Sequence, residues 1–147
     1  MMKIFIAADH AGFARKEKLK DFLAKSGYEI EDLGANELNQ DDDYPDYGLK
    51  LGEKVVDSQV LGILVCGNGQ GVCIAANKVQ GIRAVSAFTI EMAKTTRLDD
   101  DANVLCLPGR FLSDQEVEEI VATWLETEFS KADRHQRRIE KITNYER

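Results

Sequence analysis

Short apolar runs alternate with longer amphipathic segments along this chain, and the alternation predicts its secondary structure. The short runs suit strands buried in a sheet, and they occupy residues 3–8, 28–33, 61–65, 82–88 and 104–107. Helical spacing and helix-start signals place helices at residues 13–26, 47–57, 89–98, 113–125 and 132–145, with another that leaves a glycine loop and ends near residue 78. Strands that alternate with helices predict a single α/β domain over residues 1–147, a three-layer α/β/α sandwich around a five-stranded parallel sheet.

Local signals mark several helix ends. Gly27 is placed to stop the first helix, and Pro45 stands where the second would start. Thr89 is a candidate N-cap for the helix that follows it. Ser113, with Glu116 three residues later, has the spacing of a capping box.

Composition and charge argue against several classes of function. A net charge of -7 argues against a general binder of nucleic acid. No apolar run approaches the roughly 20 residues of a membrane span, and Asp9 and His10 come too early for a signal peptide. Three cysteines without the spacing of a disulfide framework indicate free thiols in a reducing cytoplasm.

The segment CGNGQG, residues 66–71, links a predicted strand to a predicted helix. Glycines let backbone N–H groups point inward, and the helix start adds positive charge, so the loop suits a phosphate or an oxyanion. A dinucleotide site would need G-x-G-x-x-G after the first strand. That strand runs into AADHAGF, and Asp32, where a ribose-binding acid would stand, has no matching loop.

Cys66 stands at the mouth of this loop and has two interpretations. The positive field of the loop favours the thiolate form of a nearby cysteine, and with it reactivity. Cysteine is also among the most buried residue types, so Cys66 would equally suit the core. Cys73 and Cys106 lie in apolar runs and are predicted to be core residues. Cys66 and Cys73 are too far apart for a C-x-x-C redox pair.

Five motifs in matching order resemble ribose-5-phosphate isomerase type B and its relatives, the allose-6-phosphate and galactose-6-phosphate isomerases. They are AADHAGF..K, YPDYG, CGNGQGVCIAANKVQGIRA, DDDANVL and WLETEF....RHQRRI, and the resemblance extends from residue 3 to about residue 142. The resemblance implies a Rossmann-like or flavodoxin-like fold. It also implies cofactor-free and metal-free interconversion of an aldose phosphate and a ketose phosphate, with ribose 5-phosphate as the first choice of substrate. A homodimer or homotetramer is implied, with active sites shared between subunits and the C-terminal helix reaching a partner.

Roles follow from the resemblance residue by residue. Cys66 matches the base that moves a proton between C1 and C2, the loop with Asn68 stabilises the enediolate, and His10 or Asp99 assists ring opening. Substrate contacts are implied for Asp9, Tyr44, Gly67, Gly69, Gln70, Gly71, Asp100, Arg110, Arg134, His135 and Arg138. Arg110, Arg134, His135 and Arg138 are associated with the phosphate. Arg134 and Arg138 are four residues apart and would share a helix face.

Three positions depart from the usual pattern of these isomerases. Asn68 stands where relatives have Thr or Ser, and Asp99 and Asp100 stand where ribose-type members have His and Asn. Ala132 and Asp133 replace two glycines. The step that opens the sugar ring is therefore left to Asp99, to His10 or to solution. A hexose phosphate substrate remains an alternative, as does a non-catalytic sugar-phosphate sensor. The basic tail could also be a solvated helix face.

Overall fold

The computed structural model describes residues 1–146 and contains one parallel sheet. Its strands are β1 (Lys3–Ala8), β2 (Glu29–Asp32), β3 (Leu61–Cys66), β4 (Ala84–Ser86) and β5 (Val104–Pro108). Their order across the sheet is β2-β1-β3-β5-β4, with every neighbouring pair parallel. This confirms the predicted five-stranded parallel sheet.

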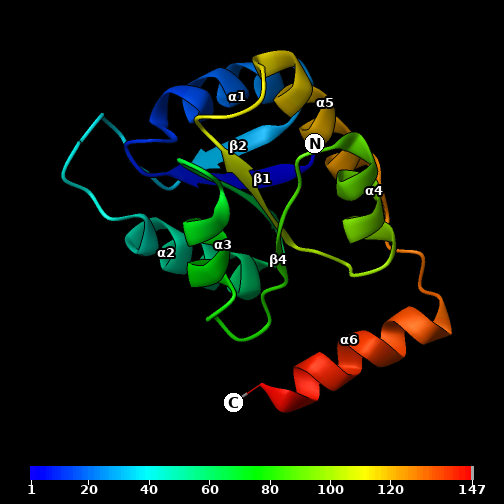
Figure 1. The fold of residues 1–147 in the computed structure, drawn as a ribbon. Helices are drawn as coiled ribbons and strands as arrows, with labels where there is room; N and C mark the ends of the chain where they lie inside the picture. Colours follow the sequence, from blue (N-terminus) through cyan, green and yellow to red (C-terminus); the bar gives the residue numbers. More distant parts are fainter. Residues whose placement is uncertain (147) are drawn as a thin grey trace.

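Helices cover both faces of the sheet (Figure 1). They are α1 (Phe13–Lys25), α2 (Tyr44–Ser58), α3 (Gln70–Ala76), α4 (Ile90–Leu98), α5 (Asp114–Glu126) and α6 (Asp133–Tyr145). One core cluster joins α1, α4 and α5 to the sheet, and a second joins α2 and α3 to it. Connections that move in opposite directions across the sheet thus use opposite faces, as right-handed crossovers require. The arrangement is the predicted three-layer sandwich.

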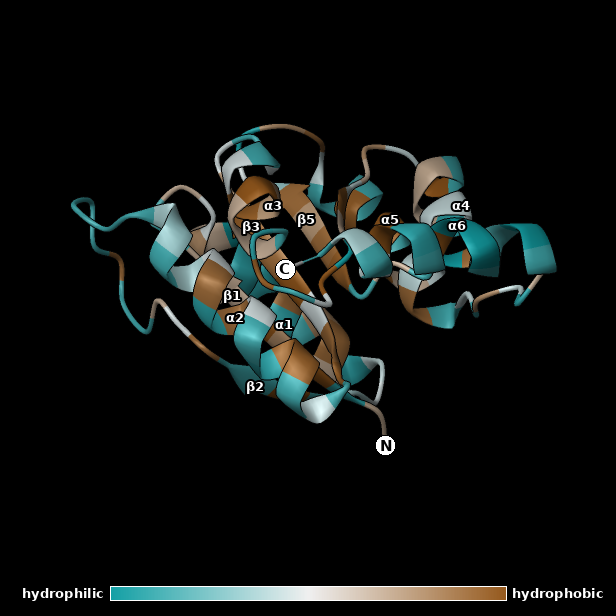
Figure 2. Cartoon of the chain, turned by 90° about the horizontal axis from the view of Figure 1, so that it is seen from below, coloured by the Kyte–Doolittle hydropathy of each residue, from teal (hydrophilic) through white to brown (hydrophobic). Residues whose placement is uncertain are grey.

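The strand interiors are almost continuously apolar because both faces of the sheet are covered. Figure 2 shows the central strands mostly in brown, and helices that carry both teal and brown residues. All five residues of β5 are buried, as are the last five of both β1 and β3. The three central strands therefore form a rigid platform, and their carboxyl ends can hold side chains in fixed positions.

Most predicted boundaries agree with the structure, and two differ. The Thr89 cap and the capping box of Ser113 are both present. α2 begins at Tyr44, one residue before the predicted start at Pro45, because Asp43 takes the N-cap position and Pro45 lies in the first turn. β4 is shorter than the predicted 82–88, because this edge strand pairs with β5 over Ala84–Ser86.

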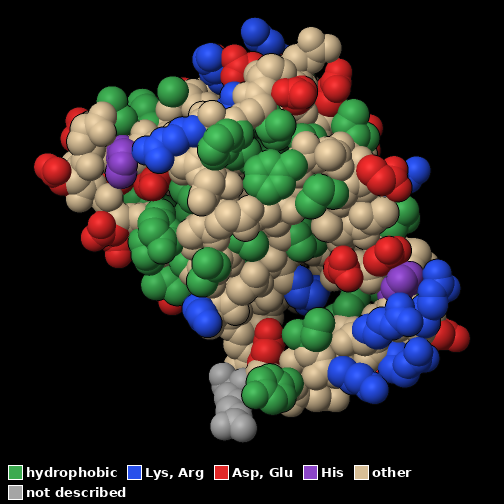
Figure 3. Space-filling view, viewed as in Figure 1, with side chains coloured by type: hydrophobic (Ala, Val, Ile, Leu, Met, Phe, Trp, Pro, Cys, Tyr) green, Lys and Arg blue, Asp and Glu red, His purple; other side chains and the backbone are tan. Residues whose placement is uncertain are grey.

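The helix α6 lies apart from the other helices, at the end of an extended segment that follows α5 (Figure 1). Its residues face β4 and the end of α4 across a cavity. Lys and Arg side chains gather along it in the lower right of Figure 3. Within residues 1–146, no helix is both long and apolar enough to cross a membrane.

Candidate active site

The carboxyl ends of β1, β3 and β5 meet at one edge of the sheet. Ala8 is level with Val65, and Cys66 is level with Pro108. The connections after β1 and β3 leave toward opposite faces, which opens a crevice at this point of the sheet. The crevice is a cavity of about 530 Å³ lined by Asp9, His10, Ala11, Tyr44, Cys66, Gly67, Asn68, Gly71, Arg110 and Phe111. Eight of the predicted site residues are therefore brought together here.

Cys66 is the last residue of β3, and its thiol reaches the cavity from a buried position. The Asn68 Oδ1 lies 4.0 Å from the Cys66 Sγ and accepts a hydrogen bond from the Gln70 backbone N–H at 2.9 Å. Because the amide oxygen is used inside the loop, the amide NH₂ of Asn68 is the group that can donate to a ligand. Asn68 can thus supply the hydrogen-bond donor expected from a hydroxyl at this position.

Two glycines of the loop allow side chains to approach it closely. A Cβ on Gly67 would lie 2.9 Å from the Arg110 Nη1, so the guanidinium packs directly on the backbone beside Cys66. A Cβ on Gly71 would lie 2.6 Å from the ring of Tyr44. The backbone N–H of Arg110 also donates to the Gly67 carbonyl at 3.1 Å. Positive charge and an aromatic wall are therefore fixed against the loop that follows the thiol.

His10 is held by a residue that the sequence did not single out. Its Nδ1 lies 2.7 Å from the Asp42 Oδ1, and its backbone N–H donates to the same oxygen at 3.0 Å. The Tyr47 hydroxyl donates to the Asp42 Oδ2 at 3.0 Å. The hydrogen bond to Asp42 raises the pKa of His10, with further contributions from the charges of Asp9 and Asp42. Burial and the same Asp42 hydrogen bond raise the pKa of Tyr47 to about 12.

Asp9 lies beside His10 in the chain but is bonded elsewhere. Its Oδ1 accepts the Gly12 backbone N–H at 3.1 Å, and burial raises the pKa of its carboxyl. Ligand atoms of Asp9, His10 and Asp42 all lie within 4.8 Å of one another, a spacing compatible with a metal ion. One of these distances, 2.7 Å between the His10 Nδ1 and the Asp42 Oδ1, is explained by the hydrogen bond between the two side chains.

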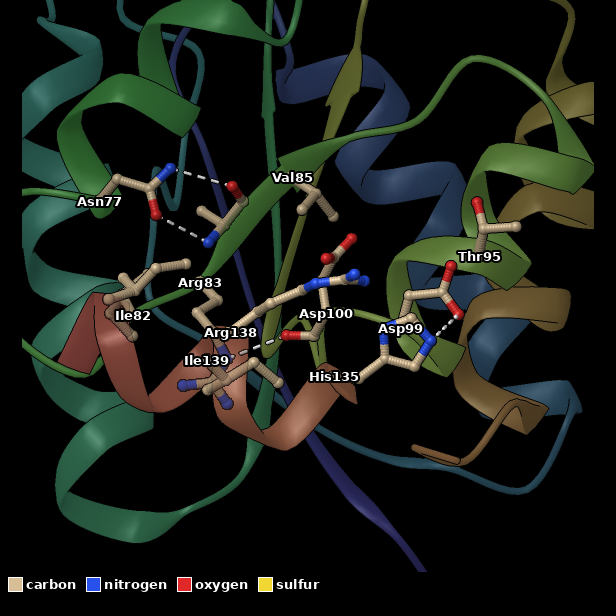
Figure 4. A pocket seen from close by; sticks show the side chains of 12 residues that line it. Asn77, Ile82, Arg83, Val85, Thr95, Asp99, Asp100, His135, Arg138 and Ile139 are labelled. Atoms are coloured by element: carbon tan, nitrogen blue, oxygen red, sulfur yellow. Dashed lines mark hydrogen bonds and ion pairs between the residues drawn. The ribbon is translucent and has the colours of Figure 1, made fainter. Parts of the chain in front are cut away.

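A second cavity, of about 430 Å³, contains most of the other predicted site residues (Figure 4). It lies between α6 and the edge of the sheet, and its lining includes Asp99, Asp100, His135 and Arg138. The His135 Nε2 lies 3.3 Å from the Asp99 Oδ1, and the ring of His135 is buried. Burial raises the pKa of Asp100, and the neighbouring charge of Asp99 adds to this. The two cavities share no lining residue.

Three predicted residues line neither cavity. Gly69 packs against the backbone of Leu107, and the Gln70 Oε1 accepts a hydrogen bond from the Ser86 hydroxyl at 3.2 Å. Arg134 is exposed in the first turn of α6.

The other two thiols lie outside the first cavity. Cys106 is fully buried in β5, as predicted for a core residue. Cys73 is only partly buried, so the prediction of a core position is met in part. A hydrogen bond from the Cys106 thiol lowers the pKa of Cys73 to about 7. Cys66 is therefore the thiol that a ligand in the first cavity would meet.

Asp32 is engaged in hydrogen bonds within the protein. Its carboxylate accepts hydrogen bonds from the Lys16 Nζ at 2.8 and 2.9 Å and from the Lys20 Nζ at 2.8 Å. The Gly34 backbone N–H donates to it as well, at 2.9 Å. These bonds occupy the acid that a dinucleotide site would use for ribose.

Comparisons with known proteins show the family and the fold of this chain. The family described as Ribose/Galactose Isomerase matches residues 4–142. The probable ribose-5-phosphate isomerase B of Mycoplasma genitalium is 44% identical over 146 residues, covering 98% of this chain and 95% of that protein. A Clostridium thermocellum ribose-5-phosphate isomerase B structure has a TM-score of 0.93 at 44% identity, covering 97% of this chain and 96% of the other. The Mycoplasma genitalium isomerase with bound ribulose-5-phosphate also has a TM-score of 0.93 at 44% identity, with 99% and 96% covered.

Proposed function

This chain belongs to the ribose/galactose isomerase family, and we propose that it interconverts ribose 5-phosphate and ribulose 5-phosphate in the cavity that Cys66 lines. It is an aldose–ketose isomerase, an intramolecular oxidoreductase. The observation that carries the assignment to this cavity is the thiol at the end of β3, which faces a ligand-sized space beside a glycine loop and a guanidinium.

The chemistry of this isomerisation fits the residues of the cavity. One base must take a proton from one carbon and return it to the next, and the enediolate between these steps needs hydrogen-bond donors. The Cys66 thiolate takes the proton from C2 of the aldose and delivers it to C1. Donors for the enediolate oxygens are the Asn68 amide and the backbone of residues 67–71.

The remaining half of the site comes, in this proposal, from a second copy of the chain. Arg110 is an arginine of the first cavity, whereas Arg138 and His135 line the second. Arginines bind phosphate through paired N–H donors, and a firmly held phosphate positions the reacting carbons. In a homodimer, α6 of one copy would bring Arg134, His135 and Arg138 to the Cys66 cavity of the other, together with Asp99 and Asp100.

A shared site predicts that two inactive variants restore each other. Cys66→Ala and Arg138→Ala are each expected to be poorly active alone. After unfolding and refolding together, random pairing should restore about a quarter of wild-type turnover, because about half the dimers are mixed and each mixed dimer has one intact site. Turnover of ribose 5-phosphate measures this. Mixed dimers without recovered activity would place both residues in a site built by one chain.

The substrate is tested by turnover of a small panel. Ribose 5-phosphate, allose 6-phosphate and galactose 6-phosphate are compared at equal concentrations, and ribose 5-phosphate is expected to have the highest kcat/KM. Preference for a hexose phosphate would assign the chain to another branch of the family. Binding of all three without turnover would support a sugar-phosphate sensor.

A further inference from the structure

The Asp42 carboxylate is the centre of a small network behind His10. It accepts from both the backbone N–H and the Nδ1 of His10, and its other oxygen accepts from the Tyr47 hydroxyl. The Asp42 side chain is 6% exposed, whereas the His10 side chain is 28% exposed. Asp42 is therefore shielded, and it presents His10 to the cavity.

This network fixes what His10 can do. An ionised carboxylate only accepts hydrogen bonds, so the His10 Nδ1 carries a hydrogen, and Nε2 is the ring nitrogen left for a ligand. His10 lines the cavity together with Cys66 and Asp9. A protonated imidazole in this position would offer an N–H to a substrate oxygen.

Isomerisation of ribose 5-phosphate requires such a donor. The sugar is mainly a cyclic hemiacetal, and the proton transfer from C2 to C1 can begin only after the ring opens. The Asp99 carboxylate, which the proposed dimer would also bring to this site, lies 3.3 Å from the His135 Nε2, and an ionised carboxylate accepts hydrogen bonds and does not donate them. His10 stands in the same cavity as the thiol that acts next.

We propose that Asp42 is a positioning residue that holds His10 as the proton donor for opening the sugar ring, and that Tyr47 in turn holds Asp42. This inference rests on the isomerase activity proposed above. In the step, the His10 Nε2–H protonates the ring oxygen while the bond from C1 to that oxygen breaks. The Asp9 carboxylate takes the proton of the anomeric hydroxyl, so C1 becomes an aldehyde. The proton then returns from Asp9 to His10 through solvent, leaving no net change in charge.

The charges around His10 support this protonation state. Asp42, from the segment before α2, and Asp9, at the end of β1, both raise the pKa of His10, while Arg110, after β5, lowers it. The raised pKa keeps the imidazolium at higher pH than in an isolated histidine. Burial raises the pKa of Asp9, which makes its carboxylate a better proton acceptor.

The test separates ring opening from proton transfer at carbon. Ribulose 5-phosphate is open-chain, because its C5 hydroxyl is esterified, so exchange of its C1 hydrogen with deuterated solvent needs Cys66 and no ring step. Asp42→Asn is expected to lower turnover of ribose 5-phosphate by about 100-fold while C1 exchange stays within about twofold of wild type. The alkaline limb of the turnover profile should move to lower pH, because removing the Asp42 charge lowers the pKa of His10.

One further variant and one control complete the test. Tyr47→Phe should lower turnover in the same direction by a smaller factor, with exchange retained. Asp41→Asn removes a neighbouring exposed carboxylate and should leave turnover, exchange and the pH profile unchanged. Retained exchange in Asp42→Asn also shows that the site is folded.

Parallel losses of exchange and turnover in Asp42→Asn would overturn the inference, because Asp42 would then support the whole cavity. Unchanged turnover would overturn it as well. A wild-type chain with neither turnover nor exchange would overturn the isomerase activity itself.

Discussion

Replacing Cys66 with alanine is expected to lower turnover of ribose 5-phosphate by at least about 10³-fold, because it removes the base proposed to move the proton between C1 and C2. Cys66 lies at a strand end paired with Pro108, and the Gly109 backbone N–H donates to the Cys66 carbonyl at 2.7 Å. Alanine keeps these backbone bonds and fills most of the same space. Folding and phosphate binding should therefore be retained, as measured by thermal unfolding and by inorganic phosphate titration.

The matched control is Cys73→Ala. Cys73 has a pKa of about 7, so its thiolate is well populated near neutral pH, but it lies outside the cavity. This variant should keep most of the wild-type turnover. Loss of activity in Cys73→Ala with near-normal activity in Cys66→Ala would contradict the assignment of the base.

The largest effect on stability is expected from the ion pair beneath β2. The Lys16 side chain is 0% exposed, and its Nζ donates to both oxygens of Asp32 and to the Ala35 carbonyl. Asp32→Ala would leave a buried ammonium without its carboxylate. The free energy of unfolding should fall by about 3 kcal/mol, measured by urea denaturation.

The control is on the same strand. Glu31 pairs with Lys3 at 2.6 Å, but their side chains are 36% and 38% exposed, so Glu31→Ala should lower the free energy of unfolding much less than Asp32→Ala. Adding Lys16→Met to Asp32→Ala should recover part of the loss, because it removes the unpaired charge. Equal losses in Asp32→Ala and Glu31→Ala would show that burial of Lys16 contributes nothing.

Acid should reduce the contribution of Asp32. Burial raises the pKa of its carboxyl, but the hydrogen bonds from Lys16 and Lys20 outweigh this and lower it. A carboxyl whose pKa is lowered by folding stabilises the protein above its unfolded value, and this stabilisation is lost as the pH falls through the folded value. The difference between wild type and Asp32→Ala should accordingly shrink in acid.

The fold could be predicted because local signals and the global arrangement agree. Alternating buried runs and helix caps placed each strand and helix to within a few residues, and the parallel sheet follows from that alternation. The start of α2 was predicted to within one residue, from Pro45. The length of β4 was predicted too long because it is limited by the pairing of β4 with β5, which no local pattern shows.

The grouping of Asp9, His10 and Cys66 in one cavity could be predicted because these residues lie at or directly after the ends of strands. Asp42 was missed because it lies 32 residues from His10, in a run of three acids that looks like a solvated loop. The only feature of the sequence that connected Asp42 with the site was its position shortly before the YPDYG segment. The separation of Asp99, His135 and Arg138 from the thiol depends on where α6 lies, which no local pattern specifies.

The strand order also governs when a growing chain can first hold a ligand. Cys66, at the end of β3, is synthesised before β4 and α4. In the sheet β3 pairs with β5, and β5 and Arg110 are synthesised only after β4 and α4. During synthesis, β3 therefore emerges with one flank unpaired until Pro108 has left the ribosome. A nascent chain shorter than this leaves the backbone N–H and C=O groups on one edge of its central strand without their β5 partners.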